Sequence, residues 1–156
     1  MSDEPRLKIY LLNGPNLNRL GLREPEVYGA MTLPELEDQC RVFAGTLGMV
    51  LDCRQSNGEG QLVDWIHEAQ EQADGIILNA GAYSHSSIAL HDALRSGPVK
   101  CLEVHISNIH RREDFRHHSY TAMASLGVIA GLGTMGYQVA LLALARILRN
   151  KSSLME

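Results

Sequence analysis

The chain has 156 residues, of which 45% are hydrophobic, and its formal net charge is -4. These values fit a single domain, residues 1–156, with one core that needs neither disulfides nor a metal. The acidic balance argues against nucleic acid as the main partner. No run of about 18 apolar residues could span a bilayer, so no membrane partner is expected. The first residues, MSDEPR, lack the features of a signal peptide, and we therefore expect a cytoplasmic protein.

The N-terminal half alternates between strand and helix patterns. The apolar run Lys8–Leu12 predicts a strand. Thr32 is the predicted N-cap of a helix whose apolar residues recur at helical spacing until Gly48. A second strand is predicted over Met49–Arg54 and a second helix over Gly60–Ala73.

The C-terminal half continues the alternation. Three further strands are predicted, over Gly75–Leu78, Val99–Ile106 and Val128–Leu132. Ser86 is the predicted cap of a helix that Gly97 closes. A long last helix is predicted from about Gly133 to Arg149.

Short apolar strands separated by amphipathic helices indicate an α/β fold, because right-handed crossovers place helices on both faces of a parallel sheet. Five strands in this length predict the flavodoxin-like form, a five-stranded parallel sheet with helices on both faces. In such sheets ligands bind outside the carboxyl ends of the strands. The loops that follow the strands are therefore the places to search for a functional site.

The longest of these loops follows the first predicted strand. The stretch NGPNLNRLGLREPEVYG, from Asn13 to Gly29, is long for an irregular connection in a compact domain, and such loops are usually lids or disordered segments. Leucines, a valine and a tyrosine stand among its charges, which favours a segment that packs when closed. We predict a lid over about residues 17–30.

Two side chains on the fourth predicted strand form a candidate proton donor. Side chains alternate along a strand, so Glu103 and His105 share one face. A carboxylate about 7 Å along the strand is close enough to orient the imidazole and favour its charged form. Four histidines elsewhere in the chain are interpreted as structural residues: His67, His91, His117 and His118.

Tyr28 in the lid is the complementary candidate, a base. A guanidinium at roughly 4 Å is worth about 4 kcal/mol at an effective dielectric near 20, which could bring a tyrosinate into range at neutral pH. Arg23 precedes Tyr28 in the same loop, and Arg112 is within plausible spatial reach. The alternative for Tyr28 is a lid residue that covers a hydrophobic patch.

The glycine-rich run, the lysines and the cysteines of the chain bear on alternative functions. The run from Gly131 to Gly136 spells G-x-G-x-x-G between a strand and a helix, and it raises the alternative of a flavodoxin-like module that holds a phosphate at Gly131. No later strand supplies the ribose-binding carboxylate of a dinucleotide fold. The lysines begin strands or lie in the tail, which disfavours Schiff-base catalysis. Odd, scattered cysteines (Cys40, Cys53 and Cys101) indicate reduced core thiols, and a silent oligomeric scaffold is a third possibility.

Taken together, these blocks resemble the type II 3-dehydroquinate dehydratase family over about residues 7 to 150. The matching segments are NGPNLNRLGLREPEVYG, ILNAGAYSHSSIALHDA, EVHISNIHRREDFRHHSY and GVIAGLGTMGY. The resemblance implies a hydro-lyase that dehydrates 3-dehydroquinate reversibly to 3-dehydroshikimate, in the shikimate pathway or in quinate breakdown. The elimination is anti and passes through an enolate, without metal or organic cofactor.

The resemblance also implies roles for individual residues. Tyr28 would be the base that removes a C2 proton, with Arg23 stabilising the tyrosinate and the transition state. His105 would be the acid that protonates the departing C1 hydroxyl. The implied substrate-binding residues are Asn79, His85, Asp92, Ile106, Ser107 and Arg116, and the implied supporting residues are Asn16, Glu103 and Arg112.

Within that set, Asn79, Ile106 and Ser107 would hold the carboxylate, and His85 and Arg116 the ring hydroxyls. Asn16 would help to position a water at the enolate oxygen. Members of the family usually form dodecamers of four trimers, and a neighbouring subunit would supply Asp92. The expected partners are therefore a small-molecule substrate and further copies of the chain.

Overall fold

A five-stranded parallel sheet forms the centre of the computed structural model, which describes residues 5–22 and 30–150. The strand order is β2-β1-β3-β4-β5, and every neighbouring pair is parallel. The strands are β1 (Leu7–Asn13), β2 (Met49–Gln55), β3 (Gly75–Asn79), β4 (Lys100–His105) and β5 (Gly127–Ala130). The α/β class and the parallel sheet predicted from the sequence are confirmed.

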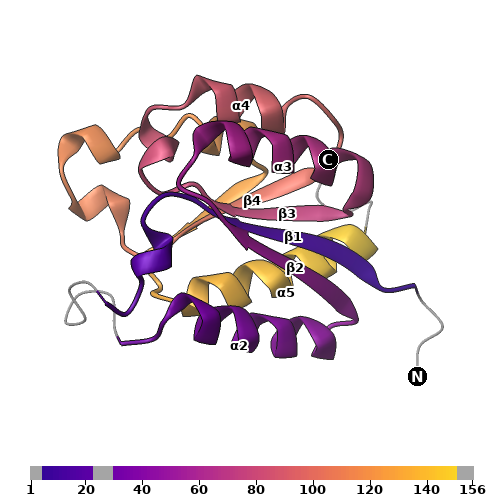
Figure 1. Ribbon diagram of the computed structural model, residues 1–156. Helices are drawn as coiled ribbons and strands as arrows, with labels where there is room; N and C mark the ends of the chain where they lie inside the picture. The colour runs from indigo at the N-terminus through magenta and orange to yellow at the C-terminus, as the bar shows by residue number, and fades with distance from the viewer. Residues whose placement is uncertain (1–4, 23–29, 151–156) are drawn as a thin grey trace.

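Helices cover both faces of this sheet (Figure 1). Helices α3 (Glu59–Gln72) and α4 (Ile88–Leu94) lie on one face, and α2 (Leu33–Thr46) and α5 (Met135–Arg149) on the other. In the described part of the chain, five short 3₁₀ helices occupy the connections: η1 (Leu17–Arg19), η2 (Gly81–His85), η3 (Ile109–Arg111), η4 (Asp114–Arg116) and η5 (Ala122–Ala124).

Alternation along β1 explains how one strand serves two cores. Ile9 and Leu11 belong to the apolar cluster on the α2 and α5 side, whereas Tyr10 and Leu12 belong to the cluster on the α3 and α4 side. A strand that is covered on both faces needs apolar side chains at successive positions, and this is why β1 is a continuous apolar run rather than an alternating one.

Three predicted helix starts shift by a residue or two, and that of α3 moves from Gly60 to Glu59. Ser87, not Ser86, caps α4, because the Ser87 hydroxyl accepts the Leu90 N–H at 3.0 Å. Ser86 instead closes the preceding turn, where its N–H donates to the carbonyl of Tyr83. The last helix starts at Met135, because Gly131 and Gly133 have φ of 89° and 63° and form the turn that leads into it.

The thiols behave as the sequence predicts. Cys40, Cys53 and Cys101 are free, and two of them are buried. Burial raises the pKa of Cys40 to about 11 and that of Cys101 to about 12, so both stay protonated at neutral pH. Among residues 5–22 and 30–150, no helix is long and apolar enough to cross a membrane.

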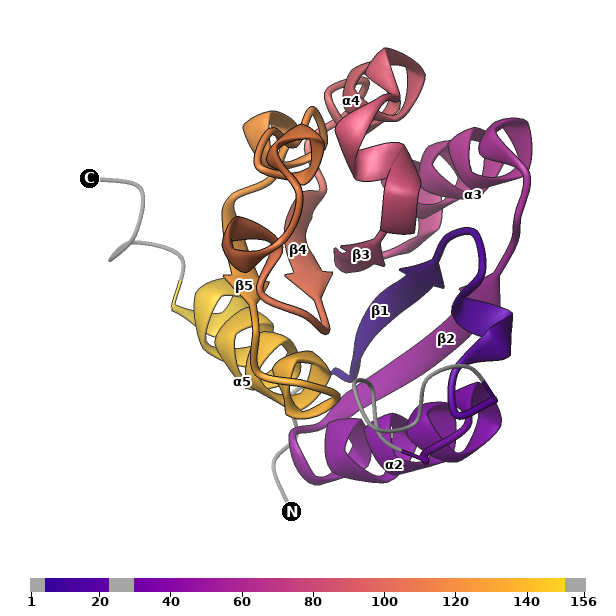
Figure 2. The same ribbon diagram turned by 90° about the vertical axis from the view of Figure 1, so that its left-hand side faces the viewer.

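The connections after β1, β3 and β4 gather at the carboxyl end of the sheet, which faces the viewer in Figure 2. The chain leaves β1 through η1, leaves β3 through η2, and leaves β4 through η3 and η4. The polar stretch predicted after the fourth strand therefore contains short helical turns rather than open loop. This end of the sheet carries the candidate site.

Candidate active site

A pocket of about 190 Å³ opens where these connections meet. This volume lies below the roughly 300–1,000 Å³ of pockets for drug-sized ligands, so the pocket suits a small molecule. Its lining residues are Pro15, Asn16, Leu17, Arg19, Leu20, Asn79, Gly81, Ala82, His85, His105, Ile106, Ser107, Ile109, Arg112 and Arg116. Three arginines and two histidines give the pocket the character of an anion-binding site.

His105 and Glu103 form a direct pair at the end of β4. Nε2 of His105 lies 2.8 Å from Oε2 of Glu103, and both side chains are almost completely buried. A carboxylate oxygen accepts, so Nε2 carries a proton and donates it. The remaining ring nitrogen, Nδ1, is then the atom that can exchange a proton with a ligand in the pocket. The shared face predicted from strand alternation is confirmed.

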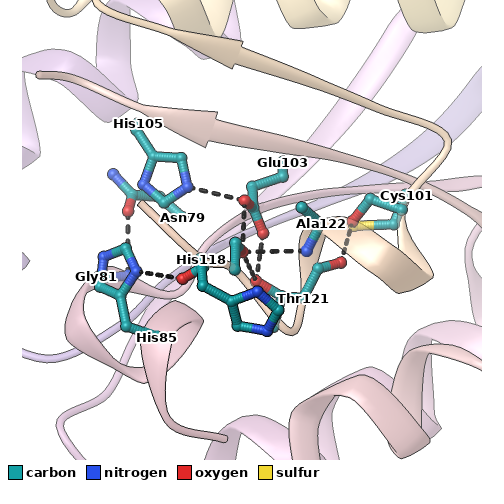
Figure 3. Close-up of polar contacts among 11 residues, drawn as sticks. Asn79, Gly81, His85, Cys101, Glu103, His105, His118, Thr121 and Ala122 are labelled. Atoms are coloured by element: carbon teal, nitrogen blue, oxygen red, sulfur yellow. Dashed lines mark hydrogen bonds and ion pairs between the residues drawn. The ribbon is translucent and has the colours of Figure 1, made fainter. Parts of the chain in front are cut away.

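The Glu103 carboxylate is fully buried and accepts from three side chains (Figure 3). Besides His105, the hydroxyls of Ser119 and Thr121 donate to it, Ser119 at 2.8 Å. Burial alone would raise the pKa of Glu103, but the pairing with His105 and the two hydroxyl donors bring the pKa below its usual range. Glu103 is therefore an ionised countercharge behind His105.

His85 lies beside His105 in the pocket. Their ring centroids are 6.1 Å apart and the ring planes differ by 21°. Nδ1 of His85 lies 2.8 Å from the carbonyl oxygen of His118, which fixes the proton on Nδ1. Burial, together with the charges of His105 and Arg116, lowers the pKa of His85. A neutral His85 with a bare Nε2 is an acceptor for a ligand hydroxyl.

The side chain of Asn79 is hydrogen-bonded to a buried tyrosine. Nδ2 of Asn79 donates to the hydroxyl of Tyr137 at 2.8 Å, and that hydroxyl donates to Oδ1 of Asn13 at 2.6 Å. Oδ1 of Asn79 accepts the N–H of Gly81 at 3.1 Å. The second N–H of the Asn79 amide remains for a ligand, because an amide nitrogen has two donors.

The glycine-rich turn after β5 supports the loop that follows β4. The N–H of Gly131 donates to the carbonyl of His105 at 3.3 Å, and the N–H of Gly133 donates to the carbonyl of Ile106 at 3.0 Å. A side chain on Gly136 would contact Val104 at 3.4 Å, which indicates close packing of helix on sheet. These N–H groups are used within the chain, so the alternative of a phosphate site at Gly131 loses its donors.

Arginines supply the positive charge of the pocket. Nε of Arg116 lies 2.8 Å from Oε2 of Glu113, and Nη1 of Arg112 lies 3.4 Å from the hydroxyl of Ser107. Glu113 itself is exposed, and it does not line the pocket. The guanidinium groups can therefore face an anionic ligand while Glu113 restrains Arg116 from the outer side.

The structure brings together most of the side chains singled out from the sequence. Eight of the predicted site residues line the pocket: Asn16, Asn79, His85, His105, Ile106, Ser107, Arg112 and Arg116. Glu103 lies directly behind His105. Asp92 is exposed on α4 and does not line the pocket of its own chain. Arg23 and Tyr28 lie outside the described residues, as do the other residues of the predicted lid between 23 and 29.

Sequence reasoning missed three polar side chains of the site. Ser119 and Thr121 hold Glu103, and Tyr137 holds Asn79. Ser119 and Thr121 stand two residues apart, and such spacing places two hydroxyls on one side of an extended segment. That pattern is the only signal the sequence offers, and it is weak.

Comparison with known proteins places this architecture in a family. The model of the family described as "Dehydroquinase class II" matches residues 7–145. A 3-dehydroquinate dehydratase of Bradyrhizobium sp. strain BTAi1 is 58% identical over 146 residues, covering 93% of this chain and 90% of the relative. The 3-dehydroquinate dehydratase 2 of Pseudomonas aeruginosa is 53% identical over 133 residues, covering 85% of this chain and 90% of the relative.

A solved structure agrees with the sequence matches. The type II dehydroquinase of Propionibacterium acnes superposes with a TM-score of 0.87 at 43% identity, covering 92% of this chain and 99% of the other. The match spans the sheet, both helical layers and the β4 end that carries the pocket. The chain therefore belongs to the class II dehydroquinase family.

Proposed function

We propose that the protein is a hydro-lyase that dehydrates 3-dehydroquinate to 3-dehydroshikimate. The observation that carries this proposal is the buried His105–Glu103 pair at a small pocket lined by three arginines. The substrate is a small carboxylate whose leaving group is a hydroxyl, so it needs cations to bind and an acid to depart. The chain shares 58% identity with a relative named 3-dehydroquinate dehydratase.

His105 is the general acid. With Nε2 held by the Glu103 carboxylate, Nδ1 gives its proton to the C1 hydroxyl, the C1–O bond breaks, and water leaves. The Glu103 charge stabilises the imidazolium before transfer. After transfer, the imidazole is neutral and must regain a proton before the next turnover.

Tyr28 is the base, and Arg23 keeps it ionised. The phenolate removes a proton from C2, the electron pair forms an enolate, and the enolate collapses to the conjugated enone as the hydroxyl departs. The described residues on either side of this segment support the assignment. Leu20 lines the pocket, and the next residue, Gly21, lies against the backbone of Ala30 and Met31, so the two flanks of the segment meet beside a pocket-lining residue.

The remaining residues bind the carboxylate and the ring hydroxyls of the substrate. The amide of Asn79 and the backbone N–H groups of Ile106 and Ser107 hold the carboxylate. His85 and Arg116 bind ring hydroxyls. Two further groups act indirectly: Asn16 positions a water at the enolate oxygen, and Arg112 supplies positive charge beside Ser107.

The site is completed by a neighbouring copy of the chain. Asp92 is exposed and lies outside the pocket of its own subunit, as expected for a residue that acts in the adjacent one. We propose a dodecamer of four trimers, the assembly that the resemblance to the family implies. Light scattering in solution gives the mass directly, and a monomer would reject this part of the proposal. The single catalytic domain and its cytoplasmic location also stay predictions.

The test of the function is an absorbance assay. Purified protein mixed with 3-dehydroquinate should produce the conjugated enone, with no added metal and in the presence of a chelator. Titration with nucleotides and flavin tests the alternative binding module, which requires saturable binding abolished by changes at Gly133. Folded protein that forms no enone would reject the dehydratase.

A further inference from the structure

A short segment after η4 contacts Glu103, His85 and His91 by alternate residues. This segment, His118–Thr121, is here called the clasp. Its odd residues, Ser119 and Thr121, point their hydroxyls at Glu103. Its even residues use their backbone: the carbonyl of His118 accepts from His85 at 2.8 Å, and the carbonyl of Tyr120 accepts from His91 at 2.7 Å.

We propose that Ser119 and Thr121 are positioning residues for the acid step, because they lock the Glu103 carboxylate in the orientation that aligns His105. This inference rests on the proposed function. It adds two hydroxyl groups that donate to the Glu103 carboxylate and do not line the pocket. Figure 3 shows Thr121 beside Glu103.

The carboxylate is the nearest acceptor for the Ser119 hydroxyl. Oγ of Ser119 accepts the N–H of Ala122 at 3.1 Å and lies 2.8 Å from Oε2 of Glu103 but 3.1 Å from Oγ1 of Thr121, so the shorter, charge-assisted bond goes to the carboxylate. The Thr121 hydroxyl donates to the other oxygen, Oε1. Three donors therefore converge on an acceptor that is fully buried, and this arrangement requires an ionised Glu103.

The two hydroxyl donors also restrict the terminal torsion of the Glu103 side chain. The terminal torsion of a glutamate side chain is broad, so a carboxylate held by His105 alone could rotate about it. Because Thr121 holds Oε1 while Ser119 and His105 hold Oε2, the plane of the carboxylate is fixed from both oxygens. The imidazole direction follows from the carboxylate plane, and a misaligned acid transfers its proton less efficiently.

The clasp is itself anchored at several points. The N–H of Tyr120 donates to the carbonyl of Ser84 at 2.8 Å, and the Ser125 hydroxyl donates to the carbonyl of Thr121 at 2.8 Å. Ser84 belongs to η2, the turn that also carries His85. One rigid segment thus sets both the acid, through Glu103, and the neighbouring His85, through the His118 carbonyl.

Removal of one hydroxyl should strengthen the electrostatic interaction between Glu103 and His105. The hydroxyls share the Glu103 charge with His105, so a carboxylate that loses a donor acts more strongly on the imidazolium. The other charged or titratable groups that line the pocket with His105, among the described residues, are His85, Arg19, Arg112 and Arg116, and no hydrogen bond joins any of them to Thr121. A change in the pH profile would therefore report on the carboxylate.

The experiment compares Thr121→Val, Thr121→Ser and Ser119→Ala with the control Thr46→Val, which removes an exposed hydroxyl on α2 bonded to the Phe43 carbonyl. We expect Thr121→Val to lower kcat about tenfold with KM changed less than about threefold, and Thr121→Ser to recover most of kcat. In Thr121→Val, the fall of kcat on the basic side of its pH profile (the basic limb) should move to higher pH.

The inference fails if a folded Thr121→Val keeps kcat within twofold and an unchanged pH profile. If Thr121→Val does not fold, Ser119→Ala decides by the same criteria. Equal losses in Thr121→Val and Thr121→Ser would also contradict it, because the hydroxyl would then be irrelevant. Loss of the proposed function is distinguishable, since in that case the wild-type protein itself forms no enone.

Discussion

The rings of His85 and His105 lie 6.1 Å apart and within 21° of parallel. Two imidazolium groups at this separation would repel each other. Burial lowers the pKa of His85, and the charges of His105 and Arg116 lower it further, whereas His105 has the Glu103 carboxylate as its partner. The two rings therefore differ in their surroundings: His85 is held as a neutral acceptor, and Nε2 of His105 donates to Glu103.

This division predicts how stability depends on pH. A histidine whose pKa is lower in the folded protein binds its proton more readily when unfolded, so the free energy of unfolding falls as pH drops through the ordinary value of 6.5. His85→Asn, which keeps a donor toward the His118 carbonyl, should flatten that fall. Urea unfolding at pH 7.5 and 5.5 measures it, above the range where Glu103 contributes. Equal falls in both proteins would count against a depressed pKa for His85.

Glu103→Gln removes the countercharge with little change in shape. The imidazolium of His105 then loses its stabilising partner, so the basic limb of the kcat profile should move to lower pH and kcat at neutral pH should fall at least about tenfold. This shift is opposite in sign to that expected for Thr121→Val. A kcat profile that does not move would show that Glu103 only fills space.

Tyr137→Phe tests the support beneath Asn79. It leaves Oδ1 of Asn13 and an N–H of Asn79 without their buried partner, which should cost about 1–3 kcal/mol of unfolding free energy and raise KM. Tyr83→Phe is the matched control, because its hydroxyl bonds the Asn57 carbonyl at an exposed position. Urea unfolding and KM measure both variants. Similar costs at the two positions would argue against a special role for Tyr137.

Gly14→Ala tests the packing that brings β1 and β3 together at the pocket. A Cβ on Gly14 would lie 2.4 Å from the backbone oxygen of Ala80, so the two connections must separate. We expect a loss of more than about 2 kcal/mol in stability and reduced activity. The control Gly45→Ala, inside α2 with open space around it, should stabilise the protein by about 0.5–1 kcal/mol. Thermal unfolding of the pair decides, and a neutral Gly14→Ala would contradict the close approach.

Much of the fold could be read from periodicity. Alternating short apolar runs and amphipathic helices determine a parallel sheet, and the rule that ligands bind at the carboxyl ends of strands located the site. Glu103 and His105 were predictable as neighbours because residues two apart on a strand share a face. These inferences depend only on local spacing.

The remaining parts of the site depend on distant contacts. Tyr137 is 58 residues from Asn79 and 124 from Asn13, and Thr121 is 18 residues from Glu103. Ser119 and Thr121 lie in a segment with no apolar periodicity, so their two-residue spacing places both hydroxyls on one side but does not indicate which buried group they reach. The choice between Ser86 and Ser87 as the cap of α4 was likewise decided by backbone geometry, since both residues have the right side chain.

We propose that His105 protonates the departing hydroxyl while a different group, Tyr28, removes the C2 proton. The most direct test follows 3-dehydroquinate with His105→Gln in deuterium oxide, measuring enone by absorbance and deuterium at C2 by mass spectrometry. We expect enone formation to fall at least about a hundredfold while C2 exchange persists, and Tyr28→Phe to lose both. Enone formation by folded His105→Gln within tenfold of wild type would contradict the assignment of the acid.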